Sequence, residues 1–290
     1  MNLDEIIDNA LKEDLGDGDI TATTILKKEI PGRARLKIKD KGVLAGVPVA
    51  ERVFQKVDPA LEVVLFKKDG DLIIPGDIVL EVTGNVRSIL AAERLVLNFM
   101  QRLSGIATST AKVVAKLKGL NTKVLDTRKT TPNLRELEKY AVRIGGGVNH
   151  RMGLYDMMLI KDNHIDFAGG IIAVIIQLRK YRAANKKSSV KVEIEVRDFE
   201  ELMVIMEYGE GLVDRIMLDN FTPEDLADAV AIIDGRFETE ASGGIKQSNV
   251  RKYAETGVDF VSVGALTHNF RSLDMNLKVV HKSIFTDGWD

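Results

Sequence analysis

Residues 126–164 read DTRKTTPNLRELEKYAVRIGGGVNHRMGLYDMMLIKDNH, and the rest of the chain is organised around this stretch. Its cationic ends, Arg128-Lys129 and Lys161, each follow a short apolar run, residues 123–125 and 157–160. Short apolar runs bounded by polar residues are typical of buried strands. Because the cations come directly after buried strands, the stretch predicts a pocket that binds an anion.

The composition narrows the possible functional classes. With 290 residues, of which 45% are hydrophobic, the chain can bury one large core or two unequal ones. Its 41 basic and 43 acidic residues give a formal net charge of −2, so no overall positive field attracts nucleic acid or membranes. Cysteine is absent, which excludes disulfides, thiolate nucleophiles and cysteine zinc sites and suits a reducing compartment.

The start of the sequence and its apolar runs bear on targeting. Its first residues, MNLDEII, are acidic where a signal peptide would be basic. No apolar run approaches the roughly 20 residues needed to span a bilayer. We therefore expect a soluble cytoplasmic protein with no nucleic-acid or membrane partner.

The first hundred residues predict a small α+β unit. Two-residue alternation over residues 33–39, 61–67 and 78–83 favours antiparallel strands. Apolar residues from Ile89 to Leu103 then recur at helical spacing, and a second helix is expected over residues 108–118.

From residue 122 onward, strand and helix patterns alternate. The predicted strands cover residues 123–126, 157–161, 190–196, 215–218, 237–241 and 260–263. The predicted helices cover residues 134–143, 170–184, 199–208, 223–233 and 248–255. Alternation of this length indicates a parallel sheet, either open or closed into a barrel.

In α/β barrels the chemistry lies at the C-terminal ends of the strands. After the early cations, these ends carry carboxylates and then small turns: Glu193 and Glu195, Asp219-Asn220, Ser242-Gly243-Gly244 and Gly264-Ala265. Glycines after late strands let backbone N–H groups approach a phosphate closely. The last two turns therefore predict a phosphate site.

Two further patterns bear on ligand binding. Glu195 and Asp219 end neighbouring strands and could share a Mg²⁺, or could only balance the charge of Lys161 or Arg128. The planar guanidinium groups of Arg128 and Arg151 suit bidentate binding of carboxylate or phosphate.

The connection before Arg151 leaves two interpretations open. Gly145-Gly146-Gly147 lacks the spacing of a dinucleotide fingerprint and is interpreted as a flexible hinge or a backbone anion nest. His150 orients either a substrate or a neighbouring side chain, and a structural hydrogen-bonded histidine is the alternative.

With these residues in place, the sequence resembles the quinolinate phosphoribosyltransferases, the carboxylating nicotinate-nucleotide pyrophosphorylases. The motifs that carry the resemblance run through nearly the whole chain: Asn98 with QRLSGIAT at 101–108, DTRKT at 126–130, KYAVR at 139–143, GGGVNHR at 145–151, KDNH at 161–164, SGG at 242–244 and VGALTH at 263–268.

The resemblance implies an α/β architecture of two domains in a type II phosphoribosyltransferase. Residues 1–105 would form an N-terminal α+β, sandwich-like domain, and residues 106–267 an open-faced α/β (TIM-like) barrel. The C-terminal tail, residues 268–290, would pack back on the first domain. Two chains would form a head-to-tail homodimer with shared active sites.

The same resemblance assigns the site residues. The carboxylates of quinolinate would be bound by Arg128, Arg151, Lys161 and Arg94 of the partner subunit. Thr127 and His150 complete this part of the substrate-binding set. Lys129, Glu195 and Asp219 would be catalytic and, with Mg²⁺ on the two carboxylates, would serve the ribose and pyrophosphate. The 5-phosphate would bind at Ser242, Gly243, Gly244, Val263, Gly264 and Ala265.

The implied reaction transfers phosphoribose from phosphoribosyl pyrophosphate to quinolinate and releases CO₂, yielding nicotinate mononucleotide and pyrophosphate for NAD biosynthesis. The alternatives are a lyase or aldolase with a Schiff base on Lys129 or Lys161, and a non-catalytic phosphometabolite-binding protein. The sequence departs from the family at Asn133, where glycine is usual, and at Arg197, where an acidic or amide residue is commoner. Both departures bear on loop conformation.

Overall fold

The computed structural model describes residues 2–185 and 189–280, and the chain divides into two compact units. The first unit combines residues 1–111, 131–146 and 269–290, and the second combines residues 112–130 and 147–268. The sequence predicted that the body of the first unit would be one continuous segment ending near residue 105. In the structure, residues 131–146 also belong to this unit. Residues 281–290 of the tail lie outside the described residues.

The first unit is built on an antiparallel sheet in the order β12-β1-β5-β3. The bounds of these strands are β1 Pro31–Ile38, β3 Glu62–Leu65, β5 Ile78–Asn85 and β12 Met275–Val279, and β2 Gly42–Val43 pairs separately with β4 Leu72–Ile73. The helices of this unit are α1 Leu3–Leu15, α2 Ile20–Ile25, α3 Val47–Val57, most of α4 Val86–Lys116, and α5 Arg135–Ile144. The sequence did not predict β12, which buries Met275 and Leu277 beside β1.

Helix α4 corrects the prediction of two separate helices, because it runs unbroken over 31 residues. Ser104 and Thr108 interact with a neighbouring segment instead of breaking the helix: their hydroxyls accept hydrogen bonds from the backbone N–H groups of Ala45 (2.9 Å) and Val43 (2.8 Å). A Cβ at Gly105 would lie 2.5 Å from the Arg271 carbonyl, so glycine here permits close packing.

Contacts of α5 explain why it belongs to the first unit. Glu138 is fully buried, accepts a hydrogen bond from Arg102 Nε at 3.0 Å and accepts another from the Thr131 backbone N–H at 3.0 Å. Tyr140 donates a hydrogen bond to Asp69. These polar anchors tie residues 131–146 to α4 and to the loop after β3.

The second unit contains six parallel strands in the order β6-β11-β10-β9-β8-β7. Their bounds are β6 Lys123–Leu125, β7 Met158–Ile160, β8 Val192–Val196, β9 Arg215–Asp219, β10 Glu238–Ser242 and β11 Phe260–Ser262, each within two residues of prediction. Within the described part of the chain, only a bridge between Leu125 and Val148 lies at the free edge of β6, so the barrel is open between β6 and β7. The expected open-faced α/β barrel is confirmed.

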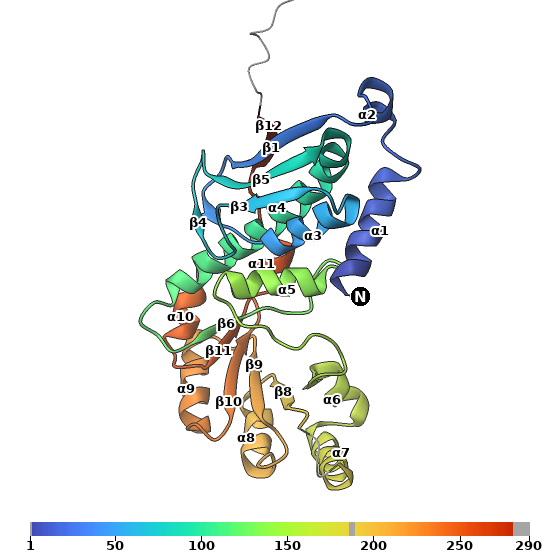
Figure 1. Ribbon diagram of the computed structural model, residues 1–290. Helices are drawn as coiled ribbons and strands as arrows, with labels where there is room; N and C mark the ends of the chain where they lie inside the picture. Colours follow the sequence, from blue (N-terminus) through green and yellow to red (C-terminus); the bar gives the residue numbers. More distant parts are fainter. Residues whose placement is uncertain (1, 186–188, 281–290) are drawn as a thin grey trace, which may run out of the picture. The chain divides into compact units, whose positions relative to one another are not determined.

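The helices of the second unit are α6 Asp162–Ala168, α7 Ile171–Ala184, α8 Phe199–Tyr208, α9 Pro223–Ile233, α10 Val250–Ala254 and the short α11 Ala265–His268. Helices α8, α9 and α10 follow one another along the sheet (Figure 1). Asp198 caps α8 by accepting a hydrogen bond from the Glu201 backbone N–H at 2.9 Å. The Glu201 carboxylate accepts a hydrogen bond from the Arg197 backbone N–H at 2.8 Å.

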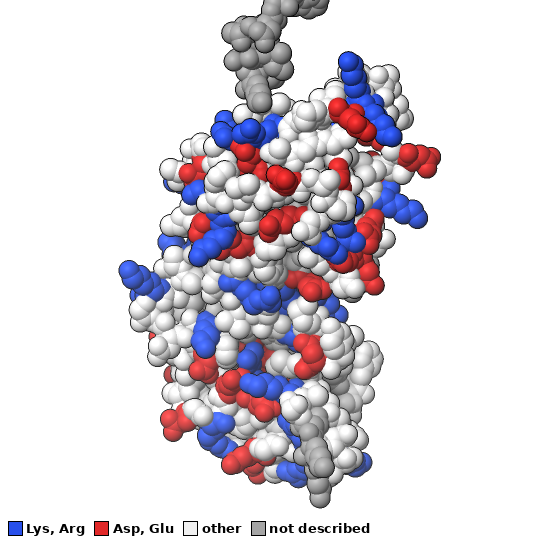
Figure 2. All heavy atoms as spheres, viewed as in Figure 1, with Lys and Arg blue, Asp and Glu red and all other residues white. Residues whose placement is uncertain are grey.

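Charged side chains of both signs are interspersed on the face drawn in Figure 2, which agrees with the nearly balanced composition. Among the described helices, none combines the length and the apolar character that crossing a bilayer requires.

Candidate active site

A polar cavity of about 330 Å³ lies at the C-terminal edge of the parallel sheet in the second unit. It brings together predicted site residues from separate segments of the chain. Its lining consists of Thr127, Arg128, Lys129, His150, Arg151, Leu159, Lys161, Met217, Glu240, Ser242 and Ser262. The cations that the sequence placed beyond β6 and β7 therefore share one cavity.

Arg151 is the most buried cation of this cavity, with 8% of the residue exposed. Burial and the nearby charge of Arg128 lower the pKa of Arg151. Its Nη1 donates to the Met157 carbonyl at 3.3 Å, whereas its Nε is buried and has no hydrogen-bond partner among the described residues. A buried guanidinium with an unused donor, next to a second arginine, fits an anion.

Lys129 lies against the late turn of the barrel. The Thr267 hydroxyl donates to the Lys129 carbonyl at 2.8 Å, and the Thr127 hydroxyl accepts from the Lys129 N–H at 3.0 Å. A Cβ at Gly264 would lie 3.1 Å from Lys129 Cδ, so the lysine side chain passes directly over this glycine. The structure thus brings the early cation and the late turn side by side.

The turn after β10 requires glycine at Gly243. Its φ is +97°, and a Cβ would lie 2.2 Å from Asn220 Oδ1. Among the residues predicted to bind the 5-phosphate, only Ser242 lines the cavity. The others lie in the two adjoining turns: Gly243, Gly244, Val263, Gly264 and Ala265.

Glu195 and Asp219 end β8 and β9 but are not among the residues that line the cavity. Glu195 is 5% exposed, and burial together with the charge of Asp219 raises its pKa. Lys161 Nζ lies 3.9 Å from Glu195 Oε2. Two neighbouring carboxylates that repel each other form an oxygen donor set that suits Mg²⁺.

Beneath the cavity, His150 contacts two fully buried carboxylates. Its Nε2 lies 2.8 Å from Glu193 Oε2 and 3.5 Å from Glu240 Oε2. Arg215 Nη1 lies 3.1 Å from Glu240 Oε2. The three potential ligand atoms of this cluster fall within 4.8 Å of one another, but the guanidinium already supplies the cation that a metal would provide.

The protonation of this cluster follows from its contacts. Burial lowers the pKa of His150, but hydrogen bonds with Glu193 and Glu240 outweigh burial and raise it to about 9. The Arg151 backbone N–H donates to His150 Nδ1 at 2.7 Å, and a ring proton there would have to displace it. We therefore take His150 as neutral, with its proton on Nε2, in spite of the raised pKa. Burial and the charge of Glu240 raise the pKa of Glu193 to about 7.

Glu240 and Arg215 were not among the predicted site residues. A sequence pattern could have identified them, because inward-facing positions of a barrel strand recur every second residue. β8 reads VEIEV, β9 reads RIMLD and β10 reads ETEAS, so charged residues recur with this period in strands that are otherwise buried.

The triple-glycine segment is not an anion nest. The Gly145 N–H donates to the Ala141 carbonyl and the Gly146 N–H to the Arg143 carbonyl, which ends α5. A Cβ at Gly145 would lie 2.4 Å from the Ala107 carbonyl, so this glycine permits α5 to pack against α4. Two of the three N–H groups that a nest would need are thus already used.

The remaining predicted residues lie outside the cavity. Arg94 is exposed on α4 in the first unit. Asn133 has φ 65°, a left-handed conformation that asparagine tolerates in place of glycine. Arg197 forms ion pairs with Asp166 (3.1 Å) and Glu201, so this departure from the family is accommodated at the surface.

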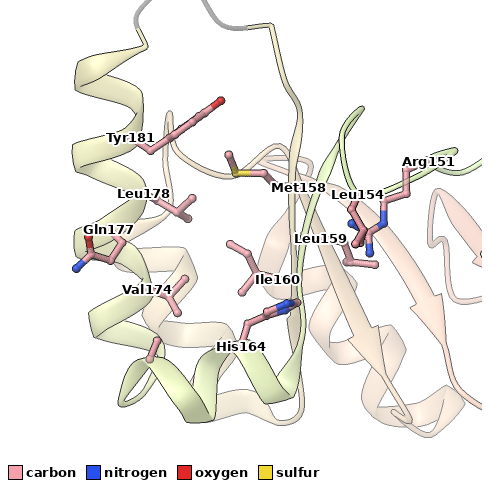
Figure 3. Close-up of a pocket in the computed structure, with 11 residues that line it drawn as sticks. Arg151, Leu154, Met158, Leu159, Ile160, His164, Val174, Gln177, Leu178 and Tyr181 are labelled. Atoms are coloured by element: carbon pink, nitrogen blue, oxygen red, sulfur yellow. The ribbon is translucent and has the colours of Figure 1, made fainter.

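A second, larger cavity of about 540 Å³ lies between β7 and α7. Figure 3 shows Met158 and Ile160 pointing from β7 toward Leu178 on α7, whereas Leu159 and Arg151 lie on the other side of the strand. Because its lining is mainly apolar, the larger cavity does not suit a highly charged substrate. The smaller cavity, which four cations line, is the better match for a charged ligand.

Comparisons with known proteins agree with this geometry. The family model described as "Quinolinate phosphoribosyl transferase, C-terminal domain" matches residues 106–278, and "Quinolinate phosphoribosyl transferase, N-terminal domain" matches residues 19–104. The chain is 44% identical to the chloroplastic carboxylating nicotinate-nucleotide pyrophosphorylase of Arabidopsis thaliana, over 96% of this chain and 83% of that protein. It is 40% identical to the probable carboxylating nicotinate-nucleotide pyrophosphorylase of Bacillus subtilis, over 96% and 94%.

A solved structure shares the architecture. The nicotinate-nucleotide pyrophosphorylase from Francisella tularensis superposes with a TM-score of 0.89 at 40% identity, covering 97% of this chain and 98% of that one. The similarity therefore extends through both units of the fold.

Proposed function

Because the chain belongs to the quinolinate phosphoribosyl transferase family, we propose that it transfers the phosphoribosyl group of phosphoribosyl pyrophosphate to quinolinate with decarboxylation. The products are nicotinate mononucleotide, pyrophosphate and CO₂, which makes the protein a pentosyltransferase of NAD biosynthesis. The plant relative is named as chloroplastic; for this chain we propose a cytoplasmic enzyme.

One observation supports the proposal above all others. Arg128, Lys129, Arg151 and Lys161 converge on a single cavity in a chain whose formal net charge is −2. Quinolinate brings two carboxylates and phosphoribosyl pyrophosphate brings several phosphate charges. A site with four cations and an unused buried guanidinium donor matches that demand.

The dicarboxylate half of the site is assigned to the residues around β6 and β7. Arg128, Arg151 and Lys161 bind the two carboxylates, aided by Thr127 and His150. Arg94 of the partner subunit completes this half in a homodimer. The exposure of Arg94 on α4 leaves its side chain available for this role.

The phosphoribosyl half is assigned to the ends of the later strands. Lys129 reaches across Gly264 and holds the pyrophosphate, and the turns after β10 and β11 bind the 5-phosphate with backbone N–H groups. Glu195 and Asp219 face the ribose, where positive charge develops as pyrophosphate leaves.

Mg²⁺ fits the carboxylates of Glu195 and Asp219, whose mutual repulsion a divalent cation relieves. When bound, it neutralises pyrophosphate charge and makes pyrophosphate a better leaving group. The residues of the chain itself orient the two substrates.

Positioning and electrostatics provide most of the catalysis. The quinolinate nitrogen attacks the anomeric carbon as the bond to pyrophosphate breaks, and the ring nitrogen becomes positively charged. That charge stabilises the electron pair left on the adjacent carbon when its carboxylate departs as CO₂. A proton then completes the nicotinate ring, and no protein nucleophile is required.

The alternative with a Schiff base is disfavoured by the environment of the lysines. Such chemistry needs a desolvated lysine with a lowered pKa. Lys129 and Lys161 are both exposed, and the Lys161 side chain is 49% accessible. A non-catalytic phosphometabolite-binding protein would leave the buried Glu195 and the half-buried Asp219, at the ends of β8 and β9, without a role.

The test is an assay of purified protein with quinolinate, phosphoribosyl pyrophosphate and Mg²⁺. Nicotinate mononucleotide should form, and Arg128→Ala should reduce kcat/KM at least about tenfold, as expected for one lost charge-assisted hydrogen bond. Lys252→Ala, which removes an exposed cation on α10, should have no effect. Absence of product would contradict the proposal, and equal turnover of nicotinic acid would move it to a non-carboxylating activity.

A further inference from the structure

Both ring nitrogens of His150 are occupied within the protein. Nδ1 accepts the Arg151 backbone N–H at 2.7 Å, and Nε2 lies 2.8 Å from Glu193 Oε2. The His150 side chain is only 6% exposed. Although His150 lines the cavity, this arrangement leaves neither nitrogen to bond a substrate carboxylate.

The backbone around His150 is fixed to the end of β6. Asp126, which is fully buried, accepts the His150 N–H at 2.8 Å and the Asn149 side-chain amide at 2.5 Å. The Val148 N–H donates to the Val124 carbonyl at 2.8 Å. This segment therefore lies at the strand edge where β6 lacks a paired neighbour.

The imidazole extends from that edge to the opposite strands. Glu193 belongs to β8 and Glu240 to β10, so His150 connects β6 with two strands that do not pair with it. Arg215 of β9 forms ion pairs with Glu240 through Nη1 and with Glu238 through Nη2, the latter at 3.0 Å. His150 thus connects the two sides of the open barrel through its contacts with Glu193 and Glu240.

Arg151 directly follows His150 in the sequence, and both its backbone N–H and its guanidinium group are hydrogen-bonded. Its N–H is bonded to His150 Nδ1, and its guanidinium is held by the Met157 carbonyl just before β7. The position of the guanidinium in the cavity therefore depends on the orientation of the imidazole. A planar guanidinium binds a carboxylate bidentately only when its plane is already oriented.

We propose that Glu193 and Glu240 are positioning residues that lock the His150 ring, and that His150 acts by orienting Arg151 for the dicarboxylate substrate. This inference rests on the proposed function and deepens it. It reassigns His150 from a direct ligand of quinolinate to a support for Arg151. It also gives a role to two buried carboxylates that the reaction itself does not use.

The experiment measures quinolinate binding by calorimetry, together with KM for each substrate, in three variants. Glu193→Leu removes the acceptor for Nε2–H, whereas Glu193→Gln keeps an acceptor oxygen at the same distance. Glu238→Gln is the matched control, since it lies on β10 and contacts the same Arg215 but lies two residues from Glu240. Circular dichroism and the melting temperature establish that each variant is folded.

We expect Glu193→Leu to weaken quinolinate binding at least about tenfold, with KM for phosphoribosyl pyrophosphate within about threefold. Glu193→Gln and Glu238→Gln should bind within about threefold of the wild type. Unchanged binding by Glu193→Leu would overturn the inference, as would equal losses for Glu193→Gln and Glu193→Leu.

A double-mutant cycle provides a second test that remains informative if Glu193→Leu does not fold. Glu240→Leu, which removes the acceptor oxygen, combined with Arg151→Lys should weaken quinolinate binding no more than the stronger single variant, because both act through one guanidinium. Additive losses would overturn the inference. Failure of the wild type to bind quinolinate would instead contradict the proposed function and so is distinguishable.

Discussion

Asn133 shows how a single residue preserves a turn that glycine would otherwise serve. Its φ of 65° lies in the left-handed region, where most side chains cost about 1–2 kcal/mol and asparagine costs less. The sequence left open whether the loop keeps its conformation with asparagine at this position. The positive φ shows that it does, because asparagine is the side chain best able to replace glycine in the left-handed region.

The first prediction concerns this residue. Asn133→Ala should lower the free energy of unfolding by about 1 kcal/mol, because alanine gains no local hydrogen bond in the left-handed conformation. Asn133→Gly should leave stability unchanged or slightly raised. Urea denaturation of the three proteins measures both differences, and equal stability of the alanine and glycine variants would contradict the explanation.

The second prediction concerns Gly243. Gly243→Ala should reduce kcat/KM for phosphoribosyl pyrophosphate at least about tenfold, because its Cβ would meet Asn220 and displace the turn that is proposed to bind the 5-phosphate. Gly235→Ala is the control, since Gly235 also has a positive φ (70°) but has open space around it. If both variants lose activity equally, backbone strain and not the contact with Asn220 is responsible.

The site residues that could be predicted from the sequence are those whose charge and position after a strand already indicate their chemistry. Arg128, Lys129, Arg151 and Lys161 follow strand ends and were predicted to share a site, and they do line one cavity. The hydrogen-bond partners of these side chains could not be predicted in the same way. That His150 bonds Glu193 and Glu240 depends on three strands converging, which no local pattern encodes.

Among the elements, the alternating segments of the second unit were predictable because most of the strands carry an apolar run and helices α8 and α9 begin at the capping residues Asp198 and Thr222. The break predicted between residues 103 and 108 was wrong. Tertiary contacts of Ser104 with the segment around Ala45, and close packing of Gly105 on residue 271, keep α4 continuous. Strand β12 was not predicted because its short alternating pattern is weak on its own and the strand forms by pairing with β1, which is distant in sequence.

A third prediction follows at this scale from the link between α4 and α5. Arg102→Ala should destabilise the protein by about 3 kcal/mol, because it leaves the fully buried Glu138 without its guanidinium partner. Arg33→Ala, which removes an exposed partner of Glu81, should cost less than about 1 kcal/mol. Denaturant unfolding measures the loss in free energy of unfolding for both variants. Equal losses would show that the buried Arg102–Glu138 pair stabilises the protein no more than an exposed pair does.

For the whole molecule, the proposed dimer makes a fourth prediction. Arg94→Ala and Lys161→Ala homodimers should each lose activity, since each lacks one contact to the dicarboxylate. In a mixed dimer, one site would carry both defects and the other neither. Unfolding and refolding an equal mixture should therefore restore about a quarter of wild-type activity, given random assortment of the chains. No recovery would exclude an arginine contributed by the partner.

In the proposed reaction, phosphoribosyl transfer is coupled to the loss of one particular carboxylate of quinolinate. The most direct measurement uses quinolinate labelled with ¹³C in either the 2-carboxylate or the 3-carboxylate, incubated with phosphoribosyl pyrophosphate and Mg²⁺. Label from the 2-carboxylate should appear in CO₂ in equal amount to nicotinate mononucleotide and pyrophosphate, and label from the 3-carboxylate should remain in the nucleotide. CO₂ release without pyrophosphate, or pyrophosphate release without CO₂, would contradict the claim.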